Sequence, residues 1–137
     1  NRYTEPLSQA IGTYLRPLIP EKPIAKLAFD QNSGFYGLQI QRGKEFYGFD
    51  ELSGGMKEQL TAALRLSMAD VLKAEHDGCL PIVFDDAFSN SDLMRVELIK
   101  KMINQAVDNG LQVVLLTCNS EAYQGFASTE ILLKANS

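Results

Sequence analysis

Two continuous apolar runs with a helical segment between them constrain the fold of this chain more than any other feature. They are LPIVF at 80–84 and LQVVLLT at 111–117. Uninterrupted apolar runs of this length are typical of strands that are covered on both faces, as in parallel sheets. The segment between them, 91–108, has apolar side chains at helical spacing and ends at Asn109-Gly110, a helix stop signal. Strand, helix and strand in this order predict an α/β protein whose mainly parallel sheet is flanked by helices.

Helical spacing also appears in two earlier segments. Residues 3–18 carry apolar side chains at this spacing, and the prolines that follow end the helix. A second helix is predicted from Met56 to about Glu75, with Arg65 on it expected in a structural ion pair. TEILLK at 129–134 predicts a last strand. The side chains expected to face the core are Leu60, Leu64, Met68, Val71 and Leu72 in the helix after Met56, and Leu93, Val96, Ile99, Met102, Ile103 and Val107 in the helix at 91–108.

Three short runs rich in β-forming residues lie between the first two helices. They are IAKLAFD at 24–30, FYGLQIQ at 35–41 and KEFYGF at 44–49, and turn residues separate them. This pattern predicts a small antiparallel meander near the N-terminus. Its aromatic side chains are expected in the core and on one exposed face of the meander rather than on a surface that stacks on bases; they are Phe35, Tyr36, Phe46, Tyr47 and Phe49.

Composition excludes several classes of protein. The 137 residues are 45% hydrophobic, as in a globular domain, and the net charge of −4 provides no overall basic field to attract nucleic acid. No apolar stretch approaches the ~20 residues that span a bilayer. Cys79 and Cys118 adjoin the apolar runs and are expected to be reduced, buried thiols of a cytoplasmic protein rather than a disulfide.

The stretch LSGG at 52–55 places two glycines where a helix begins. Each glycine costs a helix interior about 1 kcal/mol relative to alanine, so the pair needs a reason. Ser53 is placed to cap the helix, and Gly54 and Gly55 leave the first-turn amides open to an anion such as phosphate. The alternative is a capped helix whose glycines only form a turn.

Polar residues follow both apolar runs. Asp85 and Asp86 come directly after the first run, and Asn119 lies in the polar cluster after the second. Ligands of parallel α/β sheets bind outside the carboxyl ends of the strands. One acid can hold Mg2+, which takes one or two carboxylates plus phosphate oxygens, while the other faces a hydrolytic water. A solvated acid pair that caps the next helix, followed by a plain polar turn, is the alternative.

The order of these motifs resembles a known family. LSGGMKEQL, an apolar strand ending in Asp-Asp, SNSD, and a strand ending in TCN resemble the C-terminal half of an ABC-type head, a P-loop NTPase. The branch that fits best contains the SMC proteins, RecF-like proteins and double-strand-break repair ATPases, in which a coiled coil separates two half-domains. The resemblance covers roughly residues 3–134 and implies one lobe over 1–137. Its parts are the end of a returning coiled-coil arm at 1–20, the meander at 21–50, and the ATP-related motifs at 51–137.

The resemblance implies a role for each motif. Ser53, Gly54 and Gly55 match the signature motif, which in the family binds the γ-phosphate of ATP held by a second copy. Asp85 matches the Walker B aspartate, which holds Mg2+ through water. The residues that match the D-loop, which crosses the dimer interface, are Ser89, Asn90, Ser91 and Asp92.

Two positions depart from the family pattern. Asp86 stands where most members have a catalytic glutamate, and Asn119 stands where many have a switch histidine. Asparagine still forms hydrogen bonds with phosphate oxygens but carries no charge. These departures put the rate of ATP hydrolysis in question more than nucleotide binding.

The sequence lacks a P-loop, G-x-x-x-x-G-K-[ST]. The nearest candidate, GLQIQRGKE at 37–45, has five residues between Gly37 and Gly43 and reads as a hairpin. The resemblance therefore implies an N-terminal P-loop lobe of the same protein and a second copy in a head-to-tail ATP sandwich. We expect the fragment alone to bind ATP weakly and hydrolyse essentially none.

Three functions remain open from the sequence. The first is an ATPase lobe that drives a DNA-associated clamp, with DNA implied by the resemblance alone and no membrane involved. The second is a regulatory module that dimerises with ATP and hydrolyses little of it. The third is an unrelated nucleotide-binding or metal-binding α/β domain.

Overall fold

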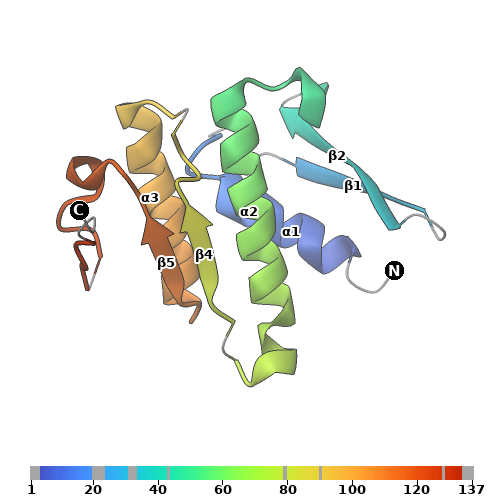
Figure 1. Ribbon diagram of the computed structural model, residues 1–137. Helices are drawn as coiled ribbons and strands as arrows, with labels where there is room; N and C mark the ends of the chain where they lie inside the picture. Colours follow the sequence, from blue (N-terminus) through green and yellow to red (C-terminus); the bar gives the residue numbers. More distant parts are fainter. Residues whose placement is uncertain are drawn as a thin grey trace.

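The computed structural model describes residues 4–19, 24–30, 34–42, 44–78, 80–89, 91–127 and 129–133. Two sheets lie on opposite sides of a central helix (Figure 1). The elements in chain order are α1 (Thr4–Leu15), β1 (Ile24–Asp30), β2 (Gly34–Arg42), β3 (Glu45–Gly48), the short helix η1 (Phe49–Glu51), α2 (Gly54–Leu72), η2 (Lys73–His76), β4 (Ile82–Asp85), α3 (Leu93–Asp108), β5 (Val113–Leu116) and η3 (Ser120–Tyr123).

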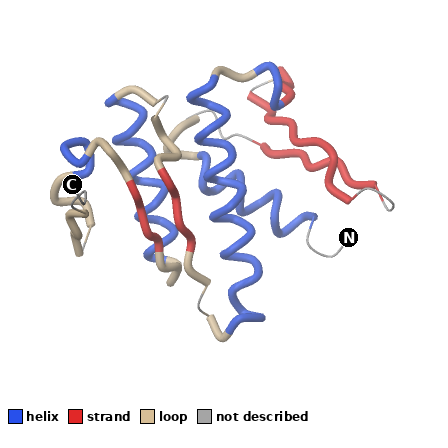
Figure 2. Tube along the Cα trace, in the orientation of Figure 1, coloured by secondary structure: helices blue, strands red, loops and turns tan. Residues whose placement is uncertain are grey.

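The sheets confirm the α/β class and the meander. Strands β1, β2 and β3 form an antiparallel sheet in that order, and β4 and β5 pair in parallel (Figure 2). In the β4–β5 pair Ile82 lies opposite Val113 and Asp85 lies opposite Leu116. The parallel sheet has two strands among the described residues.

The core forms where α1 packs against α2. Ile11 and Leu15 of α1 are fully buried, as are Leu60 and Ala63 of α2. The predicted core stripe on α2 is only partly correct, because Met68 is 43% exposed. The buried face of the helix combines large side chains such as Leu60 and Leu66 with small ones. These small buried residues are Ala62, Ala63, Ser67 and Ala69.

Helix α3 buries most of its predicted face. Val96, Ile99, Met102 and Ile103 are buried as expected, together with Ala106. The remaining two predictions for this helix are wrong. Leu93 is 73% exposed because it begins the helix at an end that extends past the strands, and Val107 is exposed while its neighbour Ala106 faces the core (Figure 1).

The apolar strands are covered on one face. Phe84 is buried between the sheet and the helices, whereas Val83 is 46% exposed, and Val114 and Leu116 on β5 are exposed on the same side as Val83. Side chains alternate along a strand, so the buried and exposed residues mark two faces. The predicted coverage of both faces is therefore wrong for the described part of the chain.

Two further predictions fail near the C-terminus. Residues 129–133 are irregular rather than a strand, and the side chains at 131–133 are exposed. A strand needs a neighbouring edge with which to pair, and local pattern carries no information about that edge. Cys118 is exposed rather than buried, and Cys79 lies outside the described residues. Within the described ranges, no helix is both long enough and apolar enough to span a membrane.

Candidate functional site

The N-terminus of α2 has the predicted cap. Ser53 is extended (φ −64°, ψ 161°), and its Oγ accepts a hydrogen bond from the Met56 N–H at 3.2 Å. Gly54 is the first residue of the helix and is exposed. A Cβ at Gly54 would meet no atom within 4 Å, so packing within this lobe does not require a glycine there. The glycine leaves open space beside the helix N-terminus, where the dipole favours an anion.

The two acids end β4 in different backbone conformations. Asp85 is the last residue of the strand, and Asp86 turns into the left-handed region with φ 51°. The Asp86 N–H donates to the Leu116 carbonyl at 2.8 Å, which extends the contact between β4 and β5 by one residue. Aspartate tolerates this conformation better than most side chains. Both carboxylates are exposed at the carboxyl edge of the sheet.

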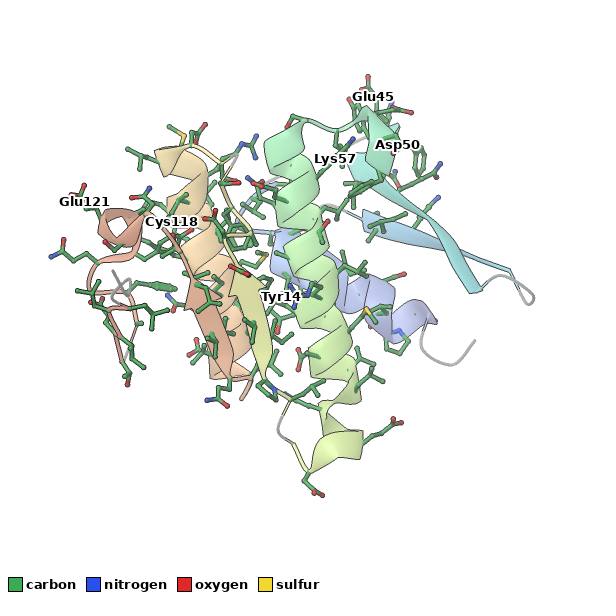
Figure 3. All side chains as sticks on the ribbon, in the orientation of Figure 1. Tyr14, Glu45, Asp50, Lys57, Cys118 and Glu121 are labelled. Atoms are coloured by element: carbon green, nitrogen blue, oxygen red, sulfur yellow. The ribbon has the colours of Figure 1, made fainter. Side chains whose placement is uncertain are left out.

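Asn119 lies at the same edge, after β5. Its N–H donates to Thr117 Oγ1 at 2.9 Å, and it precedes the short helix η3. Lys100 on α3 makes cation–π contacts with two aromatic rings that follow Asn119. Its Nζ lies 5.7 Å from the centre of the Tyr123 ring and 5.8 Å from that of Phe126. Parallel pairing of β4 and β5 thus brings Asp86 and Asn119 to one edge. Cys118 and Glu121 lie on this side of α2, opposite Glu45 and Asp50 beside the meander (Figure 3).

Two carboxylates near this edge, those of Asp86 and Glu58, act on Tyr123. Burial raises the pKa of Tyr123 above its usual value, and the charges of Asp86 and Glu58 raise it further. Glu58 lies in the second turn of α2, and its Oε2 accepts from Ser89 Oγ at 3.5 Å. The Ser89 contact with Glu58 joins the segment after β4 to the second turn of the helix that Ser53 caps.

The segment that matches the D-loop packs against α2. Ser91 Oγ accepts from Gln59 Nε2 at 3.3 Å, and Asp92 Oδ1 caps α3 by accepting from the Arg95 N–H at 2.8 Å. Asn90 lies outside the described residues. Sequence reasoning missed Gln59 and Arg95. A glutamine beside the core residue Leu60 was the signal that could have identified Gln59 as a buried polar contact.

Arg65 contacts the sheet from α2. Its Nη2 donates to the Val83 carbonyl at 2.8 Å, and its guanidinium lies 4.9 Å from the centre of the Phe84 ring. Among the described residues, its partners are therefore a strand carbonyl and an aromatic ring rather than the predicted ion pair. The contact fixes β4, which ends at Asp85, against α2.

The protein carboxylates alone do not complete a metal site. The described residues contain no group of three or more His, Cys, Asp or Glu side chains placed to hold a metal ion. Mg2+ is commonly bound by one or two carboxylates together with phosphate oxygens and water. Asp85 is exposed at the sheet edge, so its carboxylate is accessible to an ion of this kind.

Comparison with solved structures identifies the fold. An SMC ATPase studied for ATP-driven dimerisation and DNA-stimulated activation matches with a TM-score of 0.76 and 19% identity, over 98% of this chain and 80% of that one. The Smc head domain with an extended coiled coil bound to the C-terminal domain of ScpA, derived from Pyrococcus furiosus, matches with a TM-score of 0.68 and 18% identity, over 92% and 31%. The SMC head domain from Thermotoga maritima matches with a TM-score of 0.64 and 17% identity, over 90% and 41%.

The chain therefore has the fold of an SMC ATPase head lobe, as the order of its motifs predicted. A relative by sequence is the uncharacterized protein YhaN of Bacillus subtilis (strain 168), which is 26% identical over 126 residues. The match covers 92% of this chain but only 13% of YhaN. No family model matches the chain.

Proposed function

We propose that this chain is the C-terminal lobe of an SMC/RecF-like ABC ATPase that binds and hydrolyses ATP at a composite dimer interface. One combination of features carries the proposal. The same lobe has an open helix N-terminus at Ser53 and Gly54 and an acidic sheet edge at Asp85 and Asp86. The first is suited to phosphate, and the second to a metal and a water. The SMC-type fold supports the combination.

Each residue has a separate task in this proposal. The open amides after Ser53, with Gly54 and Gly55, receive the γ-phosphate of ATP held by a second copy in a head-to-tail dimer. Asp85 would hold Mg2+, and the bound ion would supply positive charge to the phosphates. Asp86 orients the attacking water, and Asn119 donates a hydrogen bond to the γ-phosphate. The segment 89–92, with Asn90 at its centre, faces the second copy.

A P-loop lobe of the same protein is the second component. The chain contains no P-loop, and the face of the β4–β5 sheet that carries Val83, Val114 and Leu116 is exposed in the described lobe. Apolar strand faces of this kind are normally covered in α/β proteins. We propose that the P-loop lobe covers this face and supplies the remaining phosphate contacts. The 137 residues alone then bind ATP weakly, which titration calorimetry tests.

The movement of the complete protein depends on the ATP-bound dimer. ATP joins two copies, and hydrolysis removes the joint, so the heads separate and the arms that continue from α1 move. We propose a cytoplasmic, nucleotide-timed clamp associated with DNA. The support for DNA is the resemblance, together with the DNA-stimulated activation studied in the matched SMC ATPase.

A regulatory module that dimerises with ATP but hydrolyses little is the second candidate. It is favoured by Asp86 and Asn119, which stand where the resemblance implies a glutamate in most members and a histidine in many. Under this candidate, nucleotide binding and dimerisation persist without turnover.

The test measures ATP hydrolysis and ATP-dependent dimerisation of the full-length protein, with and without DNA. Asp86→Asn preserves the left-handed backbone and removes the charge, so we expect dimerisation to persist and turnover to fall at least about tenfold. Wild-type dimerisation with negligible turnover would instead establish the regulatory module. A protein that neither dimerises with ATP nor hydrolyses it contradicts both candidates.

A further inference from the structure

Gln59 is a buried polar residue whose side chain joins three segments of the lobe. It is 0% exposed and immediately precedes the core residue Leu60. Its Nε2 donates to Ser91 Oγ at 3.3 Å, and Arg95 Nη1 donates to its Oε1 at 2.9 Å. Arginine has donors only, so the Arg95 contact determines the orientation of the amide and directs Nε2 to Ser91. Both hydrogen-bonding ends of Gln59 are therefore occupied.

These segments are the ones that carry the proposed contacts. Gln59 lies in the second turn of α2, the helix that Ser53 caps. Ser91 precedes α3, and Arg95 lies in the first turn of α3. Arg95 and Ser53 also line one cavity of about 240 Å3 at the N-terminal end of α2. One side chain thus connects the signature helix to the D-loop segment.

Packing alone does not explain a glutamine at this position. Burial of an amide is less favourable than burial of an apolar side chain of similar size, unless its hydrogen bonds are made. The neighbouring buried positions Leu60 and Ala63 are apolar. An amide bonded at both ends restricts the relative positions of the loop hydroxyl and the helix arginine.

We propose that Gln59 is a positioning residue that holds the D-loop in register with the signature motif. The phosphate contact at Ser53 and the contact of the D-loop with the second copy are then made together. This inference rests on the proposed function. Gln59 does not touch the nucleotide and acts through Ser91 and Arg95.

The test compares three variants of the full-length protein. Gln59→Met keeps the length of the side chain and removes both hydrogen bonds. Gln59→Glu retains an acceptor for Arg95 and for the Ser91 hydroxyl. The matched control is Gln112→Met, the same change at an exposed glutamine. The measurements are kcat and KM for ATP, and hydrogen exchange of a peptide covering 84–93 without nucleotide.

We expect Gln59→Met to lower kcat about tenfold, to change KM less than about threefold, and to accelerate exchange in the peptide. Gln59→Glu restores kcat to within about threefold of wild type, and Gln112→Met changes neither readout. Rescue by glutamate separates positioning from a general loss of folding.

Several results overturn the inference. They are wild-type kcat in Gln59→Met, reduced kcat with unchanged exchange, and no recovery in Gln59→Glu. A wild-type protein that neither hydrolyses ATP nor dimerises with it overturns the proposed function, and this inference with it. ATP hydrolysis and dimerisation of the wild-type protein therefore show whether the proposed function fails or only the inference about Gln59.

Discussion

Tyr14 and Asn109 are 95 positions apart, yet Asn109 Nδ2 donates to Tyr14 Oη at 3.1 Å. The Tyr14 hydroxyl in turn donates to Asp70 Oδ2 at 3.1 Å, and Lys73 lies 2.9 Å from the other oxygen of Asp70. Tyr14 belongs to α1, Asp70 to the last turns of α2, and Asn109 caps the end of α3. This network joins α1, the helix proposed as the end of the arm, to α2 and to the end of α3.

Tyr14→Phe is expected to destabilise the lobe by about 1–2 kcal/mol, because Asp70 and Asn109 lose a buried partner. Urea unfolding of the 137-residue chain measures the change. Tyr47→Phe is the matched control, since the Tyr47 hydroxyl donates to Glu45 at an exposed site. An equal loss of stability in both variants would show that the buried network contributes nothing specific.

The same tyrosine gives the lobe a pH dependence. Burial raises the pKa of Tyr14 from 10.0 to about 12, and the charge of Asp70 acts in the same direction. The folded state therefore favours the neutral phenol, and this stabilisation is complete below pH 10 and lost between pH 10 and about 12. We expect the difference in unfolding free energy between wild type and Tyr14→Phe to shrink across that interval. A constant difference contradicts the shifted pKa.

Gly54→Ala separates folding from function. A Cβ at Gly54 meets nothing within 4 Å and alanine favours helix, so stability is expected to stay equal or rise by up to about 1 kcal/mol. ATP-dependent dimerisation of the full-length protein is expected to weaken at least about tenfold, because the methyl group occupies the space proposed for phosphate.

Gly110→Ala provides the contrast to Gly54→Ala. The space around Gly110 is also open, but its φ of +94° strains an alanine. This variant is expected to lose about 1 kcal/mol of stability and to keep its dimerisation. Unfolding and sedimentation measurements compare the two variants. Unchanged dimerisation in Gly54→Ala contradicts a ligand at the helix N-terminus.

Asp86→Glu tests whether the left-handed backbone at this position favours aspartate over glutamate. At φ 51° a longer side chain without the local hydrogen bonding of aspartate is less favourable, so we expect a loss of about 0.5–1 kcal/mol. Asp86→Asn, which tolerates the same conformation, is expected to match wild type within about 0.5 kcal/mol. Thermal unfolding measures both variants. Equal stability of all three proteins would show that the left-handed turn does not favour aspartate at this position.

Local pattern predicted most of the secondary structure. Periodicity and stop signals identified α2, α3 and the β4–β5 pair, and turn residues identified the meander. The cap at Ser53 also followed from sequence, since it needs only the adjacent turn. Order and spacing of the motifs predicted the SMC-type head fold, which the structural matches confirm. Roles assigned to Asp85, Asp86 and Asn119 remain predictions.

Only the tertiary structure decided which faces are buried and which distant residues meet. Met68 and Leu93 were predicted to be buried and are exposed, because burial depends on the neighbouring element and not on the period of one helix. Segment 129–133 reads as a strand but has no strand pairing in the described structure. Contacts such as Gln59 with Ser91 join segments far apart in the chain. Sequence determined the local elements because their hydrogen bonds are local, whereas packing and long-range polar contacts arise only after these elements assemble.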